Sequence, residues 1–232
     1  FFASLAFPQV RLAVARPGEA AGPMELVTPG AESRPLALTG PSVPPGAGET
    51  LRRFLALGVT HILPFGLDHV LFVAGLALLS PRLAPLLLQV TAFTLAHTLT
   101  LALSSYGVVS LPSRLVEPLI ALSIVYVGVE NAVSPRLRPS RVVLVFAFGL
   151  LHGLGFAGVL AEMGLPDRHH LLALLAFNVG VELGQLAVIA LVSGALALWA
   201  LRGGDRRALV RPASLGIAAI GLFWTVERAL GV

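Results

Sequence analysis

From Leu51 onward, apolar residues dominate long runs that short polar stretches separate. About 20 apolar residues are needed for a helix to cross the hydrocarbon core of a bilayer. The pattern therefore predicts six transmembrane helices, approximately at residues 53–80, 84–107, 115–133, 141–161, 171–201 and 209–230. Pro64 and Gly66 interrupt the first run, which predicts a broken helix. The fifth run would be about 46 Å long as a helix, so it must tilt or protrude.

Residues 1–48 follow a different pattern, in which short apolar runs alternate with Pro-Gly and Gly-rich breaks. Short strands joined by turns have this pattern. The sequence thus predicts two domains, an extramembrane β-rich segment with its linker at 1–48 and a transmembrane helical domain at 49–232. The predicted fold class is an all-α polytopic membrane protein preceded by that segment.

Composition supports a membrane protein and excludes several other classes. Hydrophobic residues make up 56% of the chain and charged residues only 12%, whereas about 25% of residues are charged in soluble domains. All 16 basic residues are Arg and they are scattered, so no nucleic-acid-binding face is expected. Cys is absent, which excludes a thiolate metal site and a Cys nucleophile. The expected surroundings are the lipid bilayer.

Arginine placement predicts the orientation in the membrane. The connections after the first, third and fifth predicted helices hold eight arginines: Arg82, Arg136, Arg138, Arg141, Arg202, Arg206, Arg207 and Arg211. The connections after the second and fourth hold two, Arg114 and Arg168. The positive-inside rule puts the first set in the cytoplasm. We therefore expect a multi-pass membrane protein whose N-terminus lies outside the cytoplasm, in the periplasm if the cell is a Gram-negative bacterium. Residues 1–48 could bind a protein partner there.

Ionisable residues occur inside four of the predicted helices, where a charge at the helix centre costs about 2.5 to 3.5 kcal/mol. They are His61, Asp68 and His69 in the first helix, His97 in the second, His152 in the fourth and Glu182 in the fifth. A single intramembrane histidine is as often a hydrogen-bond partner between helices as it is part of a metal or proton site. Together, these residues predict a shared metal or proton site, since imidazole and carboxylate bind Ni²⁺, Co²⁺, Zn²⁺ or Fe²⁺.

Further polar residues are candidates for a supporting role. Glu117 and Asn131 are fourteen positions apart, on one face of the third helix, with Glu130 adjacent. Asn178 and Gln185 form a polar stripe with Glu182 at i, i+4 and i+7. Simpler roles are open for some of them. The carboxylate of Glu117, near a helix start, would interact favourably with the helix dipole, and Glu130 could reach water. Glu227, near the end of the last helix, could also reach water or pair with Arg228.

Five motifs in order resemble the HupE/UreJ family of bacterial membrane proteins, over about residues 50–200. They are "HILPFGLDHVLFVAGLALLS", "VTAFTLAHTLTLAL", "VEPLIALSIVYVGVEN", "FGLLHGLGFAGVLAEMGLP" and "FNVGVELGQLAVIAL". The closer resemblance is to the branch with an extracytoplasmic N-terminal β segment. Members are implicated in nickel or cobalt uptake, and their signature of His followed by Asp-His falls here on His61, Asp68 and His69. Six residues separate His61 from Asp68 here, against five in nickel-associated members.

Three functions remain open at this point. The first is a permease for a divalent transition metal, nickel, cobalt or zinc. The second is an intramembrane metal-dependent enzyme of the zinc-hydrolase kind, with Glu182 or Asp68 as general base. Neither HExxH nor GxSxG occurs in the chain. The third is an assembly or sensor protein that binds a partner through residues 1–48.

Overall fold

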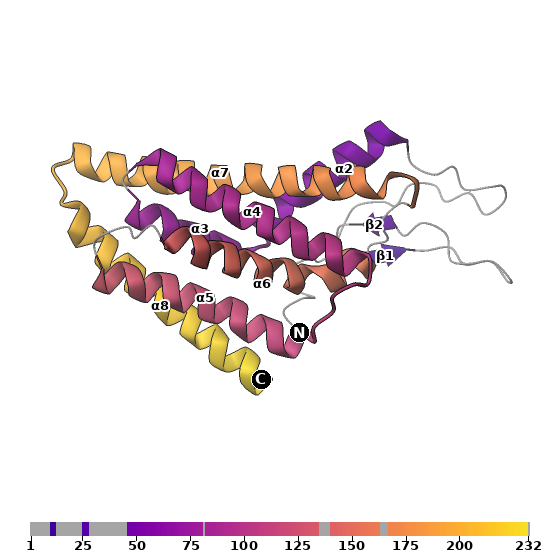
Figure 1. The fold of residues 1–232 in the computed structure, drawn as a ribbon. Coiled ribbons are helices and arrows are strands. Elements are labelled where there is room, and N and C mark those ends of the chain that lie inside the picture. The colour runs from indigo at the N-terminus through magenta and orange to yellow at the C-terminus, as the bar shows by residue number, and fades with distance from the viewer. Residues whose placement is uncertain are drawn as a thin grey trace, which may run out of the picture.

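The computed structural model describes residues 10–12, 25–27, 46–80, 82–134, 140–162 and 167–231. Its helices are α2 (Ala47–Ile62), α3 (Leu67–Leu79), α4 (Leu83–Ser105), α5 (Ser113–Val133), α6 (Arg141–Glu162), α7 (His170–Leu201) and α8 (Arg206–Leu230), with a short 3-10 helix η1 (Asp167–His169) before α7 (Figure 1). Within the described part of residues 49–232 the predicted all-α architecture is confirmed.

Two short strands lie in the segment that precedes the helices. β1 (Val10–Leu12) and β2 (Glu25–Val27) pair antiparallel, with Val10 opposite Val27. The rest of residues 1–45 lies outside the described residues, so the β-rich character of the segment stays a prediction. The domain boundary after residue 48 also stays a prediction, and α2 already begins at Ala47.

Four helices, α4, α5, α7 and α8, are long and apolar enough to cross a membrane among the described residues. Helices α2 and α3 together would make a fifth crossing, bent by 69° at the break. Four predicted crossings and the break in the first are thereby supported. In α6 the apolar stretch Arg141–Phe156 is shorter than the others, so the fourth predicted crossing, at residues 141–161, stays a prediction.

The break between α2 and α3 follows from the residues that form it. Pro64 has no backbone N–H to continue the helix. Gly66 is needed because a Cβ at this position would collide with the carbonyl oxygen of His61. Backbone hydrogen bonds from Phe65 to Thr60 (3.4 Å) and from Gly66 to Ile62 (3.2 Å) satisfy carbonyls that the break would otherwise leave unpaired.

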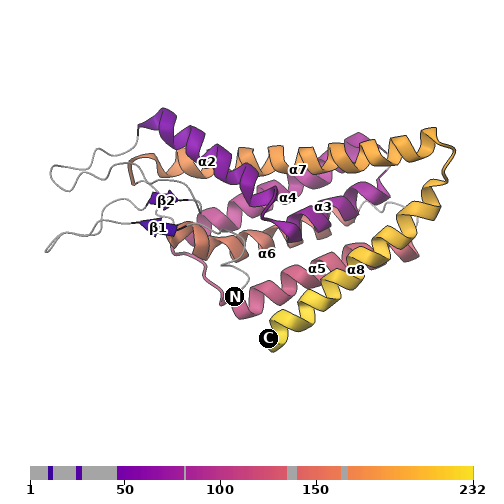
Figure 2. The same cartoon turned by 180° about the vertical axis from the view of Figure 1, so that it is seen from behind.

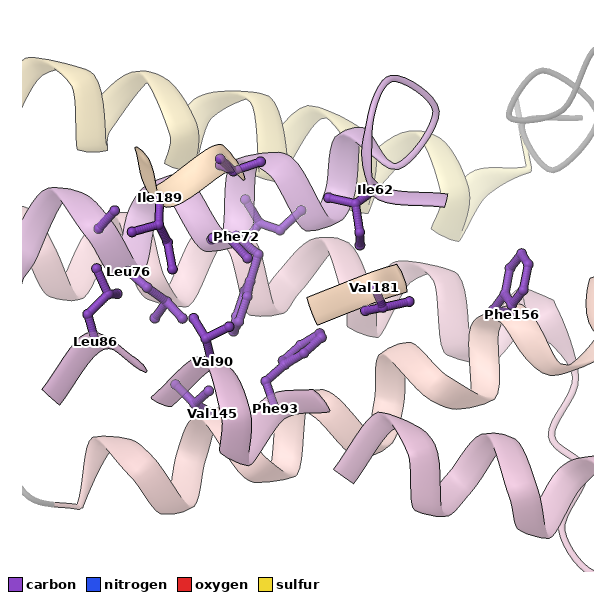
Figure 3. Packing of buried hydrophobic residues seen from close by; sticks show 14 of the residues in the cluster. Ile62, Phe72, Leu76, Leu86, Val90, Phe93, Val145, Phe156, Val181 and Ile189 are labelled. Atoms are coloured by element: carbon purple, nitrogen blue, oxygen red, sulfur yellow. The ribbon is translucent and has the colours of Figure 1, made fainter. Parts of the chain in front are cut away.

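Helix α3 occupies the centre of the bundle. The outer helices pack as three pairs, α2 with α7, α4 with α6 and α5 with α8, and α3 contacts α5, α7 and α8 between them (Figures 1 and 2). Its side chains Phe72 and Leu76 are fully buried in the hydrophobic cluster, together with Phe93 of α4 (Figure 3). Because α3 is central, the residues of its first turn face several helices at once.

Glycines let the paired helices approach closely. A Cβ on Gly180 of α7 would lie 2.9 Å from the Cα of Gly58 on α2. A Cβ on Gly149 of α6 would lie 3.0 Å from the Cα of Phe93 on α4, so a larger residue at either glycine would collide with the facing helix. Small residues at such crossings are typical of helix packing in membranes. The α2–α7 contact fixes the end of α2, where His61 lies.

Candidate metal centre

Three histidines from three helices converge at the break. His61 is in the last turn of α2, His69 in the first turn of α3 and His97 in the middle of α4. One ring nitrogen from each lies within 4.8 Å of the others, and all three side chains are buried. We call these residues the His triad. Three imidazole nitrogens at this spacing can hold a divalent transition metal.

Aromatic rings surround the His triad. The ring centroid of Phe156 lies 4.1 Å from that of His61, and Phe177 lies 5.4 Å from the same ring. Phe156 and Phe177 stack on each other at 5.0 Å, and the ring of Phe93 meets that of His69 edge-on at 5.7 Å. These rings exclude water from the imidazoles and keep the site in an apolar surrounding.

Hydrogen bonding fixes which nitrogen of His97 is available. Asn178 donates its Nδ2 hydrogen to the carbonyl oxygen of Leu174 (2.8 Å), so its Oδ1 faces Nδ1 of His97 at 3.2 Å. In a neutral imidazole Nδ1 then donates and Nε2 carries the lone pair. Nε2 is buried and has no hydrogen-bond partner among the described residues. The lone pair of this nitrogen is therefore available for coordination.

A second chain of hydrogen bonds orients His69 through His152 of α6. Ser123 donates its hydroxyl hydrogen to the carbonyl oxygen of Ile120 (2.6 Å), so its oxygen accepts from Nε2 of His152 at 3.1 Å. Nδ1 of His152 is then an acceptor and lies 3.4 Å from Nε2 of His69. Nε2 of His69 therefore carries the hydrogen that points to His152, and Nδ1 of His69 carries the lone pair. His152 thus contacts the His triad without belonging to it.

Asp68 faces away from the His triad and forms an ion pair. Its carboxylate oxygens lie 3.0 and 3.1 Å from Nη2 of Arg228 on α8. The guanidinium also donates to the backbone oxygen of Glu117 (3.3 Å) and lies 5.4 Å from the ring of Trp224. Of the two roles expected for Glu227, pairing with Arg228 is not observed among the described residues, where Arg228 pairs with Asp68 instead. Arg228 reaches Asp68 and the backbone of Glu117 because α8 packs against both α3 and α5.

The polar stripe of α7 faces α4. Asn178 bonds His97 as described, Glu182 accepts from the hydroxyl of Thr91 (3.0 Å), and Gln185 lies 3.0 Å from the hydroxyl of Thr94. Glu182 is therefore separate from the His triad, on the far side of Asn178. The stripe begins at the triad and continues along α7.

Glu130 and Asn131 lie at the opposite end of α5 from Glu117. There the Arg141 guanidinium lies 3.4 Å from Glu130 and donates to Asn131 (3.0 Å), which itself donates to the carbonyl oxygen of Gly75 (2.7 Å). Arg141 is only 2% exposed, although the sequence placed it in a loop. The group joins α3, α5 and α6 and is remote from the His triad.

Comparison with known families adds one finding to this geometry. The family model for HupE / UreJ protein matches residues 41–228, which is most of the chain. The chain belongs to the HupE/UreJ family. No curated protein and no solved structure matches it. The match covers α2 to α8 almost completely, and so includes every residue of the site described above.

In this HupE/UreJ protein, sequence reasoning missed three residues at or near the site. Ser123 orients His152, Thr94 faces Gln185, and Arg228 holds Asp68. Hydroxyls inside a transmembrane helix commonly bond their own backbone, so nothing singled out Ser123 or Thr94. Arg228 did carry a signal, because an arginine inside a predicted transmembrane helix needs a partner at similar depth.

Proposed function

We propose that this protein is a permease for a divalent transition metal of the nickel or cobalt type, and that the His triad receives the ion. The observation that carries the proposal is the convergence of three buried imidazoles within 4.8 Å, one of them with an unpartnered Nε2. Membership of the HupE/UreJ family supports it, since the resemblance of the motifs implies nickel or cobalt uptake.

The ligand chemistry suits passage of an ion rather than permanent retention. Imidazole nitrogen binds Ni²⁺, Co²⁺ and Zn²⁺ well, and the chain offers no thiolate to hold them more tightly. A carboxylate would add a charge that strengthens binding, but Asp68 is held by Arg228. Three neutral ligands leave coordination positions through which the ion can enter and leave.

The break in the first transmembrane segment supports transport as well. His61 ends one half-helix and His69 begins the next, with a 69° bend between them. Transporters build their substrate sites from such discontinuous helices near the middle of the bilayer. Irregular backbone at that depth is tolerated only where it is buried in protein or lines a cavity.

An intramembrane zinc hydrolase is the second candidate, because three histidines with an open position are also the ligand set of catalytic zinc sites. Such an enzyme needs a carboxylate near the metal-bound water as general base. Asp68 is paired with Arg228, and Glu182 lies on the far side of Asn178 from the triad. Neither carboxylate lies where that role requires, so we favour the permease.

We further propose that the protein lies in the bacterial inner membrane with the connection between α7 and α8 in the cytoplasm. Arg202, Arg206 and Arg207 in this connection support that orientation. Residues 1–48 would then lie outside the cytoplasm. The test is a reporter that works only in the cytoplasm, fused before α2. Activity of that reporter would contradict this topology.

The test of the permease is Ni²⁺ uptake into liposomes that contain the purified full-length protein. For His61→Asn we expect Ni²⁺ uptake and Ni²⁺ affinity each to fall at least about tenfold. Loss of a residue that only orients a metal ligand already costs about 10- to 100-fold in metal affinity or activity, and His61 is proposed as a ligand itself. His169→Asn is the matched control, since His169 lies in η1 outside the triad. Wild-type uptake by His61→Asn, or metal-dependent hydrolysis without uptake, would overturn the proposal.

A further inference from the structure

The outer face of α5 carries a groove that is separate from the His triad. Its volume is about 530 Å³, and the apolar side chains of Leu122, Val129 and Val133 line it together with Tyr126. These four residues are exposed, and α5 is long and apolar enough to cross a membrane. The groove therefore opens toward the hydrocarbon of the bilayer.

The length of the groove matches one leaflet of a bilayer. From Leu122 to Val133 the helix advances eleven residues, which is about 16 Å at 1.5 Å per residue. The hydrocarbon core of a bilayer is about 30 Å thick, so one leaflet contributes about 15 Å. One acyl chain of one leaflet can therefore lie along the whole groove.

Glu130 is the charged residue among the described residues that line the groove. Its carboxylate is balanced by the buried guanidinium of Arg141, whose Nη1 lies 3.4 Å from Oε2 of Glu130. The wall of the groove thus carries no net charge at this point. A cationic head group would gain little here, because the carboxylate already has a counter-charge.

Arg211 of α8 lies at the same depth as one end of the groove. Ser134, the C-cap of α5, lines that end. Helices α5 and α8 run antiparallel side by side (Figures 1 and 2), and Asn131 donates to the hydroxyl of Ser214 at 3.4 Å. Ser134 follows Asn131 by three residues and Arg211 precedes Ser214 by three. Both therefore lie about one turn beyond this hydrogen bond, in the same direction.

The charge of Arg211 has no counter-charge in the part of the chain that the structure describes. Arg211 is exposed, and neither of the two ion pairs among the described residues includes it. The sequence also places Arg136 and Arg138 directly after Ser134. Arginines near a bilayer surface attract anionic lipids, and a guanidinium binds a phosphate group through two parallel hydrogen bonds. An anion at this end of the groove would be favoured.

We propose that this groove binds one anionic phospholipid, whose acyl chain lies along α5 from Leu122 to Val133 and whose phosphate is held by Arg211. Such a lipid covers the apolar groove and supplies the missing anion with one molecule. An apolar helix of a second copy would cover the groove but leave Arg211 without an anion. The inference is independent of the proposed permease, since the groove contains no residue of the His triad.

The test is native mass spectrometry of the purified full-length protein with phosphatidylglycerol or phosphatidylcholine that carry the same acyl chains. We expect one retained phosphatidylglycerol per protein and weaker retention of phosphatidylcholine. For Arg211→Gln the affinity for phosphatidylglycerol should fall about fivefold, the contribution of one arginine near an anionic lipid. Arg168→Gln is the matched control, because Arg168 is also exposed but lies in η1, before α7. It should leave phosphatidylglycerol binding unchanged.

A second variant tests the groove while Arg211 stays intact. Val129→Trp fills the groove and should abolish retention of phosphatidylglycerol. Leu119→Trp is its control, because Leu119 is as exposed on α5 as Val129, at 44% and 45%, but is not among the described residues that line the groove. Equal affinity for the two lipids, or equal losses in Arg211→Gln and Arg168→Gln, would overturn the proposal. Wild-type retention by Val129→Trp would overturn it as well, since the phosphate would then bind without the groove.

Discussion

At the scale of single residues, neighbours in sequence serve different partners. Asp68 and His69 are adjacent in the first turn of α3, and successive helical residues point about 100° apart. His69 therefore faces His61 and His97, while Asp68 faces Arg228 on α8. The sequence predicted that both residues of the Asp-His pair belong to one cluster. Only the histidine contributes to the His triad.

The ion pair of Asp68 leads to a prediction about stability. Asp68→Asn leaves the Arg228 guanidinium, which is 10% exposed, without a counter-charge. We expect a loss of about 1.5 to 3 kcal/mol of unfolding free energy, the range for hydrogen bonds to charged groups. The double variant Asp68→Asn/Arg228→Gln should recover most of it, because no unpaired charge remains. Thermal unfolding in detergent micelles measures both.

The matched control for this prediction is Glu227→Gln, one position from Arg228 on α8. Oε2 of Glu227 has no hydrogen-bond partner among the described residues, so this change should cost less stability and less function than Asp68→Asn. A double variant as unstable as Asp68→Asn alone, or a larger effect of Glu227→Gln, would contradict the assigned role of the pair.

At the scale of elements, the sequence predicted the broken helix from Pro64 and Gly66 but not what the break brings together. In an unbroken helix, His61 and Asp68 would share a face, since they are seven residues apart. The 69° bend changes this, and His61 meets His69 instead, with ring centroids 4.7 Å apart. Local breaking residues can be read from a sequence, whereas the direction of the bend depends on α7, which packs against α2.

The contact between α2 and α7 should be sensitive to side-chain size. Gly180→Leu forces the two helices apart, because even a Cβ would lie 2.9 Å from the Cα of Gly58. We expect a loss of about 1 to 3 kcal/mol from overpacking, and weaker Ni²⁺ binding since His61 moves with α2. Melting temperatures with and without Ni²⁺ report both effects.

Gly194 supplies the matched control for this substitution on the same helix. A Cβ there would meet nothing within 4 Å, so Gly194→Leu should behave like the wild type. Equal melting temperatures and equal Ni²⁺ shifts for Gly180→Leu and Gly194→Leu would show that the close crossing does not position His61.

At the scale of the whole molecule, hydropathy predicted the helices because each crossing is a local property of about 20 residues. The long-range contacts were beyond it. Arg141 was assigned to a loop because it lies near a helix end. It is buried instead, because its guanidinium contacts Glu130 and Asn131 of α5. Likewise, six ionisable residues on four predicted helices suggested a cluster, but which three histidines meet depends on how α3 packs among its neighbours.

The most direct test of the central claim is X-ray absorption at the nickel edge on purified full-length protein loaded with Ni²⁺. The account predicts nitrogen ligands with the scattering of imidazole rings from the three histidines of the triad. In His97→Gln the imidazole contribution should fall by one ring, while His169→Asn should match the wild type. A spectrum without imidazole scattering, or one that His97→Gln leaves unchanged, would contradict the His triad as the metal site.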